Sequence, residues 1–388
     1  MTTAKTQRRI AVVSTYLPRR CGLATFAHDL VGALRDAEPN CEVDVIAVGP
    51  PNSAFVYPPI VAHALRNTSI ASYHAAASFI NNGGYDVVSL QFEHGIFGDS
   101  HGEVGLEFLR SLRVPVVTTL HSDLDRGFEL ERRVLRGVVA ASDATVAMTD
   151  FATQRLIAEF DGPVARIVQV PHGVPDLPYA EPGEWKDRLG LGDRPVVLNF
   201  GLLARHKGVA TAIEAIAKVR NVYEDVLFVV AGPTSATELA QHGEGFRHSL
   251  QDYACRLGLD KHVRFDDKFI VDEELHQLVQ ACDVLLTPYS HYLQGISGTL
   301  SYGLAAGKAV ISTPFPYAQE MLSAGAGVLV PFNDAAALAA AITRILGDNA
   351  LRTKVRHSAH ERAQNLLWRR VGARYLSIFD KVQAKGKQ

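Results

Sequence analysis

The feature that most restricts the fold is a regular alternation of short, β-branched apolar runs with helical patterns. Six such runs occur in the first half of the chain, at residues 9–14, 42–48, 85–90, 114–120, 144–148 and 166–171. Amphipathic helical patterns lie between most of them. This alternation predicts a doubly wound parallel sheet, and the ligands of such domains bind beyond the carboxyl ends of the strands.

A second series of runs follows a break in this pattern. The break contains Pro178, Pro182, Gly183 and Gly192. Six further strand-like runs follow it, at residues 195–201, 226–232, 263–269, 283–289, 309–313 and 327–332. We therefore interpret the break as a connection between two α/β domains of the same kind.

The predicted architecture is α/β, with two Rossmann-like domains facing an interdomain cleft. The first domain is expected at residues 1–178, the linker at 179–194 and the second domain at 195–365. A helix over residues 366–388 could pack back on the first domain. The length agrees with this division, because 388 residues exceed what one compact core usually holds.

Composition excludes several classes of protein. The formal net charge of -2 gives no basic field for nucleic acid. No apolar run reaches the roughly 18 residues of a membrane-spanning helix, and the N-terminal stretch lacks the design of a signal peptide. We therefore expect a cytoplasmic protein. The cysteines show neither disulfide-framework nor zinc-site spacing; they are Cys21, Cys41, Cys255 and Cys282.

A basic cluster near the N-terminus leaves peripheral membrane contact open. It consists of Arg8, Arg9, Arg19 and Arg20. Such charges are more often simply solvated.

The stretch 294–307 (QGISGTLSYGLAAG) is suited to phosphate binding. It follows a strand-like run and leads into a helix of small residues. Gly295 and Gly298 allow close approach of an anion, Ser297 and Thr299 carry hydroxyls, and helix N-terminal amides carry partial positive charge. The alternative is an ordinary strand-to-helix turn.

Two further turns follow predicted strands. Gly22 opens the first helical pattern, and its amides are expected to face the cleft, although a plain helix start explains it too. The turn 201–208 places Arg205, His206 and Lys207 between a strand and a helix, where cations can neutralise a phosphate. Basic residues on solvated turns are also ordinary.

Strand ends in the first domain carry other polar side chains. His121 follows the run 114–120, where it could bind a polar ligand or move protons. Asp123 and Asp125 form a DxD pattern, more typical of a helix first turn than of a metal site. No Walker A, HExxH or GxSxG sequence occurs, so nucleophile and zinc mechanisms have no support.

The order of these motifs resembles that of the GT-B glycosyltransferases of family 4, which are retaining enzymes that use nucleotide-sugars. The resemblance covers nearly the whole chain. Its motifs are TTLH at 118–121, VPHGV at 170–174, FGLLARHKG at 200–208 and GTLSYGLAAGKAVIST at 298–313. It implies that Gly22 and neighbouring amides face the phosphates or the acceptor. It also implies that His121 contacts the transferred sugar, that Lys207 holds the donor phosphates, and that the backbone of Phe269 and Ile270 flanks the base.

Two departures from the family pattern bear on nucleotide recognition. Leu202 stands where members usually have arginine, which leaves Lys207 without that partner unless Arg205 replaces it. Members also carry two glutamates eight positions apart, and Gln294 and Tyr302 occupy those positions. A tyrosine offers one hydroxyl where a carboxylate would accept from both ribose hydroxyls.

We therefore predict a retaining hexosyltransferase that moves a sugar from a nucleotide-sugar donor to a hydroxyl acceptor, a saccharide or a small molecule. No cofactor or metal is expected. The predicted catalytic residues are His121, Lys207 and Gln294. The predicted donor-binding residues are Gly22, Arg205, Phe269, Ile270, Gly295, Ser297, Gly298, Thr299 and Tyr302.

Two alternative functions stay open. The missing ribose-binding acid is compatible with a glycan phosphorylase of the same fold that uses phosphate or a sugar 1-phosphate. A non-catalytic sugar- or nucleotide-binding protein is the third hypothesis.

Overall fold

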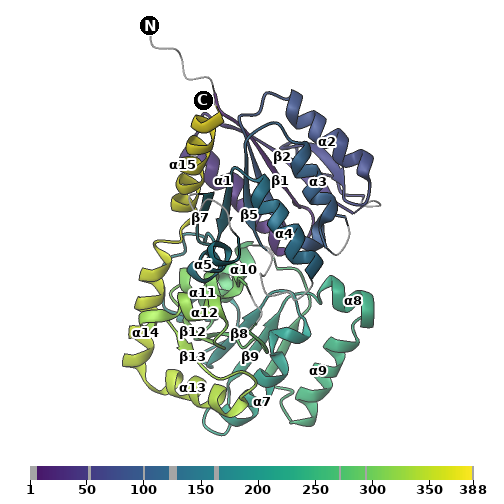
Figure 1. Ribbon diagram of the computed structural model, residues 1–388. Helices are drawn as coiled ribbons and strands as arrows, with labels where there is room; N and C mark the ends of the chain where they lie inside the picture. Colours follow the sequence, from purple (N-terminus) through teal and green to yellow (C-terminus); the bar gives the residue numbers. More distant parts are fainter. Residues whose placement is uncertain are drawn as a thin grey trace. The chain divides into compact units, whose positions relative to one another are not determined.

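The computed structural model describes residues 7–50, 54–98, 101–121, 129–160, 166–270, 272–292 and 295–386. The chain divides into two compact units (Figure 1). Unit 1 comprises Met1–Gly173 and Trp368–Gln388, and unit 2 comprises Val174–Leu367.

Unit 1 is built on a parallel sheet of seven strands in the order β3-β2-β1-β4-β5-β6-β7. The strands are β1 Arg9–Ser14, β2 Glu42–Gly49, β3 Val61–Arg66, β4 Val87–Phe92, β5 Val116–Leu120, β6 Ala144–Ala147 and β7 Ile167–Gln169. The six expected strands are present. β3 was not expected, because it lies at the sheet edge, where most of its side chains stay exposed or partly exposed and no continuous apolar run is needed.

Helices cover both faces of this sheet, as the right-handed crossovers between parallel strands require. They are α1 Gly22–Ala37, α2 Ile70–Asn82, η1 His94–Ile96, α3 Glu103–Ser111, α4 Glu129–Ala141, α5 Asp150–Glu159 and α15 Trp368–Gly386.

The last helix, α15, returns to unit 1 and packs against α1 (Figure 1). Gly372 lets the two helices approach closely, since a Cβ there would lie 2.4 Å from the carbonyl oxygen of Ala33. The buried hydroxyls of Tyr375 and Thr119 are 2.8 Å apart, which connects α15 to β5. The segment that ends the chain is therefore an integral part of unit 1.

Two of the four arginines in the N-terminal basic cluster form ion pairs inside unit 1. Arg8 is buried and pairs with Glu38 at 3.3 Å and with Asp380 of α15. Arg9 pairs with Glu42 at 2.8 Å and with Asp44 at 3.1 Å. These two charges therefore contribute to the cohesion of unit 1. Among the described helices, none has the length and apolar character needed to cross a bilayer.

Unit 2 has a parallel sheet of six strands in the order β10-β9-β8-β11-β12-β13. The strands are β8 Val196–Phe200, β9 Leu227–Ala231, β10 Val263–Asp266, β11 Val284–Thr287, β12 Ala309–Ser312 and β13 Val328–Leu329. The helices are α6 Gly183–Arg188, η3 Arg205–Lys207, α7 Val209–Val219, α8 Ala236–His242, α9 Gly245–Arg256, α10 Asp272–Ala281, α11 Gly298–Ala305, α12 Pro316–Met321, η4 Ser323–Gly325, α13 Ala335–Gly347 and α14 Asn349–Ala363. Each strand overlaps a run of the second series.

The segment 179–194, expected as a linker, is held on unit 2. Lys186 of α6 lies 2.7 Å from Asp283, and both side chains are nearly buried. Arg356 of α14 donates to both carboxylate oxygens of Glu181, at 2.8 and 2.7 Å. The division between the units falls instead after Gly173 and Leu367. Proline and glycine marked irregular backbone here, but these ion pairs make it part of a folded unit.

Candidate active site

The start of α11 is the first element of the candidate site, and its hydroxyls are engaged within the protein. Ser297 is the N-cap, and its Oγ accepts a hydrogen bond from the amide of Leu300 at 3.1 Å. Thr299 donates its hydroxyl to the carbonyl of Phe200 at 2.9 Å. The amides of Gly298 and Thr299 belong to the first turn and have no partner within the helix. An anion at this helix start would therefore meet amides rather than the two hydroxyls.

Lys207, on the loop between β8 and α7, is the second element of the candidate site. It ends η3, after β8, and its Nζ lies 4.2 Å from the centroid of the Tyr289 ring. The hydroxyl of Tyr289 lies 2.7 Å from Oγ of Ser297. Tyr289 thus joins the Lys207 loop to the start of α11. Sequence reasoning missed Tyr289, although an aromatic residue at the carboxyl end of the 283–289 run was an indication.

Backbone contacts fix these two loops against each other. Gly208 has φ +69°, and a Cβ on it would lie 1.7 Å from the carbonyl oxygen of Pro288. The amide of Ser290 donates to the carbonyl of His206 at 2.9 Å. A glycine is therefore required directly after Lys207, both for the backbone angle and for the close approach.

Arg205, which the sequence offered as a replacement for the missing family arginine, contacts two residues of later helices. Its Nε lies 3.4 Å from Glu238, and its guanidinium lies 4.8 Å from the centroid of the Phe246 ring. The Arg205 side chain is 60% exposed, so solvent screens this ion pair strongly. Glu238 and Phe246 were not predicted, because both lie on later helices and nothing local pairs them with Arg205.

The remaining predicted donor residues of unit 2 lie in α11, just before it, or after β10. Tyr302 is partly exposed, and its ring is 6.0 Å from that of Phe200 and 5.9 Å from that of His276. Phe269 and Ile270 follow β10, and Ile270 packs on the core of unit 2. Gly295 precedes α11 and is partly buried.

Three residues considered from the sequence, Gln294, Asp123 and Asp125, lie outside the described residues. Within the described ranges, no cluster of three or more His, Cys, Asp or Glu side chains could hold a metal ion.

In unit 1, His121 follows β5 and is held by a hydrogen bond. Its Nε2 lies 2.9 Å from Oε1 of Gln91. The side-chain amide of Gln91 donates to Oγ of Ser89 at 3.0 Å, which assigns its oxygen to face the imidazole. His121 Nε2 therefore carries a proton as donor, and a neutral ring presents Nδ1 as an acceptor.

An aromatic cluster surrounds this histidine. Phe26 of α1 packs edge-on against His121, His172 and Trp368, with ring centroids 4.7, 5.2 and 5.1 Å apart. Burial lowers the pKa of His121 to about 3, with a smaller contribution from His172. Burial also lowers the pKa of His172 to about 4, against the opposing effect of its hydrogen bond to the Gly173 carbonyl. Both rings are thus neutral near pH 7, which argues against a proton shuttle at His121.

His172 was not among the predicted site residues. It lies in VPHGV, shortly after β7, and so had the same strand-end position that pointed to His121. Gly22 begins α1, its N-cap Cys21 forms no side-chain cap, and a Cβ on Gly22 would meet no atom within 4 Å. The start of α1 therefore lacks a side-chain cap, unlike the start of α11, which Ser297 caps.

These depressed pKa values predict an acid-sensitive fold. Both histidines have an ordinary pKa of 6.5 when unfolded, so below that pH the unfolded chain binds more protons and the free energy of unfolding falls. The loss extends from about pH 6.5 toward the folded values. In His121→Asn, the free energies of unfolding measured with urea at pH 7 and pH 5 should differ by less than they do in the wild type. An equal pH dependence of the free energy of unfolding in the two proteins would contradict the lowered pKa of His121.

Comparison with known proteins agrees with both units. A family model described as Glycosyltransferase Family 4 matches residues 21–176, and one described as Glycosyl transferases group 1 matches residues 183–365. The chain belongs to the glycosyltransferases of group 1 and family 4. Its fold is GT-B, with two Rossmann-like units, as the sequence resemblance implied.

Two similar curated proteins are named as a glycosyltransferase and a mannosyltransferase. The chain is 29% identical to the lipopolysaccharide core biosynthesis glycosyltransferase LpsE of Rhizobium meliloti, over 53% of this chain and 52% of that protein. It is 26% identical to a phosphatidyl-myo-inositol mannosyltransferase of Mycolicibacterium smegmatis, over 81% of this chain and 76% of that one. The match thus spans about half the length of the first relative and about three quarters of the second.

Solved structures share the fold at low identity. A sucrose-phosphate synthase from Thermosynechococcus elongatus superposes with a TM-score of 0.78 at 19% identity, covering 98% of this chain and 100% of that one. The Anabaena HepE protein, solved with UDP and glucose, superposes with a TM-score of 0.74 at 16% identity, covering 97% and 100% of the two chains.

Proposed function

We propose that this protein is a retaining glycosyltransferase that moves a sugar from a nucleotide-sugar donor to a hydroxyl group of an acceptor, without a metal ion. The observation that carries the proposal is the junction of Lys207, Tyr289 and the start of α11. It brings a cation, and helix amides that have no partner within α11, to one edge of the unit 2 sheet. The named activities of the relatives support the same reaction class.

Positive charge at this junction matches the needs of the leaving group. When the bond between the anomeric carbon and the diphosphate breaks, negative charge grows on the departing oxygen. Lys207 and the Gly298 and Thr299 amides are fixed before the reaction and can stabilise that charge. Because these groups already supply positive charge, the proposed reaction requires no divalent cation.

Contacts to the nucleoside are proposed to contribute less to donor affinity than contacts to the diphosphate. Tyr302 offers one hydroxyl to the ribose, where the family pattern has a carboxylate. The backbone beside Phe269 and Ile270 is proposed to flank the base. We therefore expect the diphosphate to dominate binding, with UDP or GDP binding much more tightly than the corresponding nucleoside.

In unit 1, His121 is proposed to accept a hydrogen bond from a substrate hydroxyl through Nδ1. Gln91 fixes the ring and its tautomer, and the Phe26 contact limits rotation. The amides at the start of α1, beside Gly22, are proposed to face a polar group of a substrate.

The test is calorimetric titration with UDP-, GDP- and ADP-sugars in the presence of EDTA. We expect saturable binding of at least one donor, followed by NMR detection of a product with the anomeric configuration of the donor. No saturable binding of any of these donors would count strongly against the proposal. Phosphate-dependent release of sugar 1-phosphate from an oligosaccharide would favour the phosphorylase hypothesis instead.

A further inference from the structure

A connection in unit 1 that normally contains a helix has none in its described part. β2 and β3 are neighbouring parallel strands, so the chain must cross over the sheet between them. Such crossovers usually carry a helix that fills the space on the sheet. Here the described part of the crossover, Ala54–Ile60, contains no helix and includes Pro58 and Pro59. Chain without helical structure is thinner than a helix, so the segment 54–60 leaves room beside α1.

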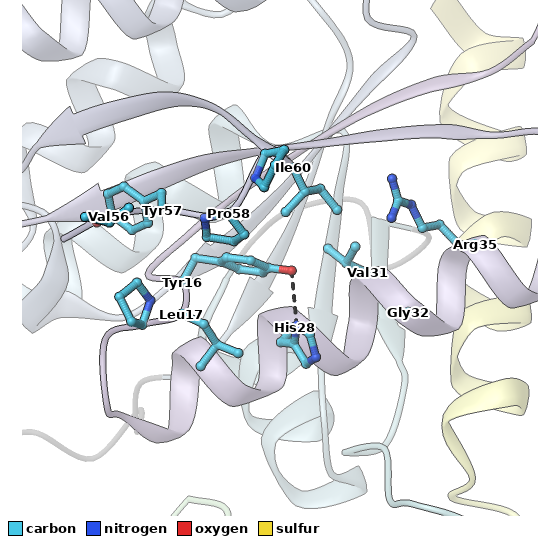
Figure 2. A pocket seen from close by; sticks show the side chains of 12 residues that line it. Tyr16, Leu17, His28, Val31, Gly32, Arg35, Val56, Tyr57, Pro58 and Ile60 are labelled. Carbon is cyan, nitrogen blue, oxygen red and sulfur yellow. Dashed lines mark hydrogen bonds between the residues drawn. The ribbon is translucent and has the colours of Figure 1, made fainter. Parts of the chain in front are cut away.

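That room is a cavity of about 670 Å³, within the usual range for small-ligand sites (Figure 2). One wall is α1 and the other is the segment 54–60. The apolar side chains in the lining are Leu17, Pro18, Val31, Val56, Pro58, Pro59 and Ile60. Val56 is 89% exposed, so among the described residues this wall presents apolar surface to solvent.

Polar groups in the lining are few: Tyr16 follows β1, Tyr57 lies on the segment 54–60, and His28 and Arg35 lie on α1. Tyr16 is buried, and its hydroxyl lies 3.2 Å from Nδ1 of His28 (Figure 2). His28, Val31, Gly32 and Arg35 share one face of the helix, at spacings of three, four and seven residues. Arg35 is therefore about 10 Å further along the axis than His28.

Arg35 supplies the only cationic guanidinium among the described lining residues. It is exposed, and within the described ranges it makes no ion pair or hydrogen bond. A cation at one end of an apolar trough is complementary to an elongated apolar molecule that carries one negative charge. A neutral apolar molecule would leave the guanidinium unused, and a purely polar anion would leave the apolar walls uncovered.

We propose that this cavity, which we call the α1 pocket, binds an apolar molecule with a single anionic group, such as a fatty acid or an alkyl phosphate. The apolar body lies between Val31 and Ile60, and the anionic group pairs with Arg35. The pocket consists entirely of unit 1 residues. Ligand binding can be measured directly, so the inference stands or falls independently of the proposed glycosyl transfer.

The test uses laurate, dodecyl phosphate, 1-dodecanol and inorganic phosphate as probes for the full-length protein. Displacement of a dansyl-labelled undecanoic acid should show saturable, competitive binding of laurate or dodecyl phosphate near one molecule per chain. Dodecanol should bind at least about tenfold more weakly, because it lacks the charge. Inorganic phosphate should not compete. Absence of saturable binding by both anionic probes would overturn the proposal.

Two variants locate the ligand. Gly32→Phe places a ring in the pocket, because a Cβ there meets no atom within 4 Å, and helix propensity rises at this position. It should abolish probe binding, whereas the matched control Gly32→Ala should bind nearly as the wild type does. Arg35→Gln should weaken laurate by about tenfold and dodecanol by less than about twofold. Unchanged affinity for laurate in either Gly32→Phe or Arg35→Gln would contradict the assignment.

Discussion

Replacing Lys207 with methionine is expected to lower kcat for glycosyl transfer by about 100-fold or more. The Lys207 ammonium lies 4.2 Å from the centroid of the Tyr289 ring, next to the proposed diphosphate position in unit 2. Methionine retains a flexible apolar stem of similar length and can still pack on that ring, so the fold should persist. What is lost is the charge that stabilises the leaving diphosphate.

The pattern of kinetic constants distinguishes this role from simple donor binding. If Lys207 acts mainly in the transition state, kcat and kcat/KM fall together; if it only binds donor, KM rises and kcat is preserved. The matched control is Lys218→Met, which removes an exposed lysine from α7 of the same unit. A wild-type rate in Lys207→Met, with a donor that saturates the enzyme, would remove Lys207 from the site.

Gly208→Ala is expected to destabilise unit 2 by about 2 to 4 kcal/mol and to reduce activity at temperatures where the unit is still folded. The added Cβ would lie 1.7 Å from the carbonyl oxygen of Pro288, and φ is +69°. The backbone fixes the position of the Cβ, and the Pro288 oxygen is itself a backbone atom, so no side-chain rotation relieves the contact. The loops of Lys207 and Tyr289 must move apart, which separates the cation from the start of α11.

Urea unfolding, followed by circular dichroism, measures the first effect, and donor titration measures the second. Gly245→Ala is the matched control, since a Cβ at the start of α9 meets no atom within 4 Å. This control should leave unfolding within about 0.5 kcal/mol of the wild type. A Gly208→Ala protein with wild-type stability would show that the close contact can be relieved at little cost.

The sequence predicts the strands of this protein better than the partners of its site residues. Strands that are buried on both faces require continuous β-branched runs. The sequence therefore predicts every strand except the half-exposed edge strand β3. Lys207 and the start of α11 were predicted as site residues because strand-end loops collect at one edge of a parallel sheet.

Side-chain partners depend on contacts between distant parts of the chain. The pairing of Arg205 with Glu238, of His121 with Gln91 and of Tyr289 with Ser297 leaves no pattern in local sequence. The direction of the Ser297 and Thr299 hydroxyls was likewise not predictable, because a serine at a helix start can cap the helix or meet a ligand.

The return of α15 to unit 1 sets an order for folding during synthesis. Unit 2 is one continuous segment, Val174–Leu367, and can form as soon as it has left the ribosome. Unit 1 must wait for its last helix, whose buried face contains Val371, Tyr375 and Phe379. Until those residues emerge, the matching apolar surface of α1 and β5 stays exposed on the nascent chain. A chain that stops at residue 367 should therefore contain a folded second unit and a first unit that chaperones and proteases recognise as incomplete.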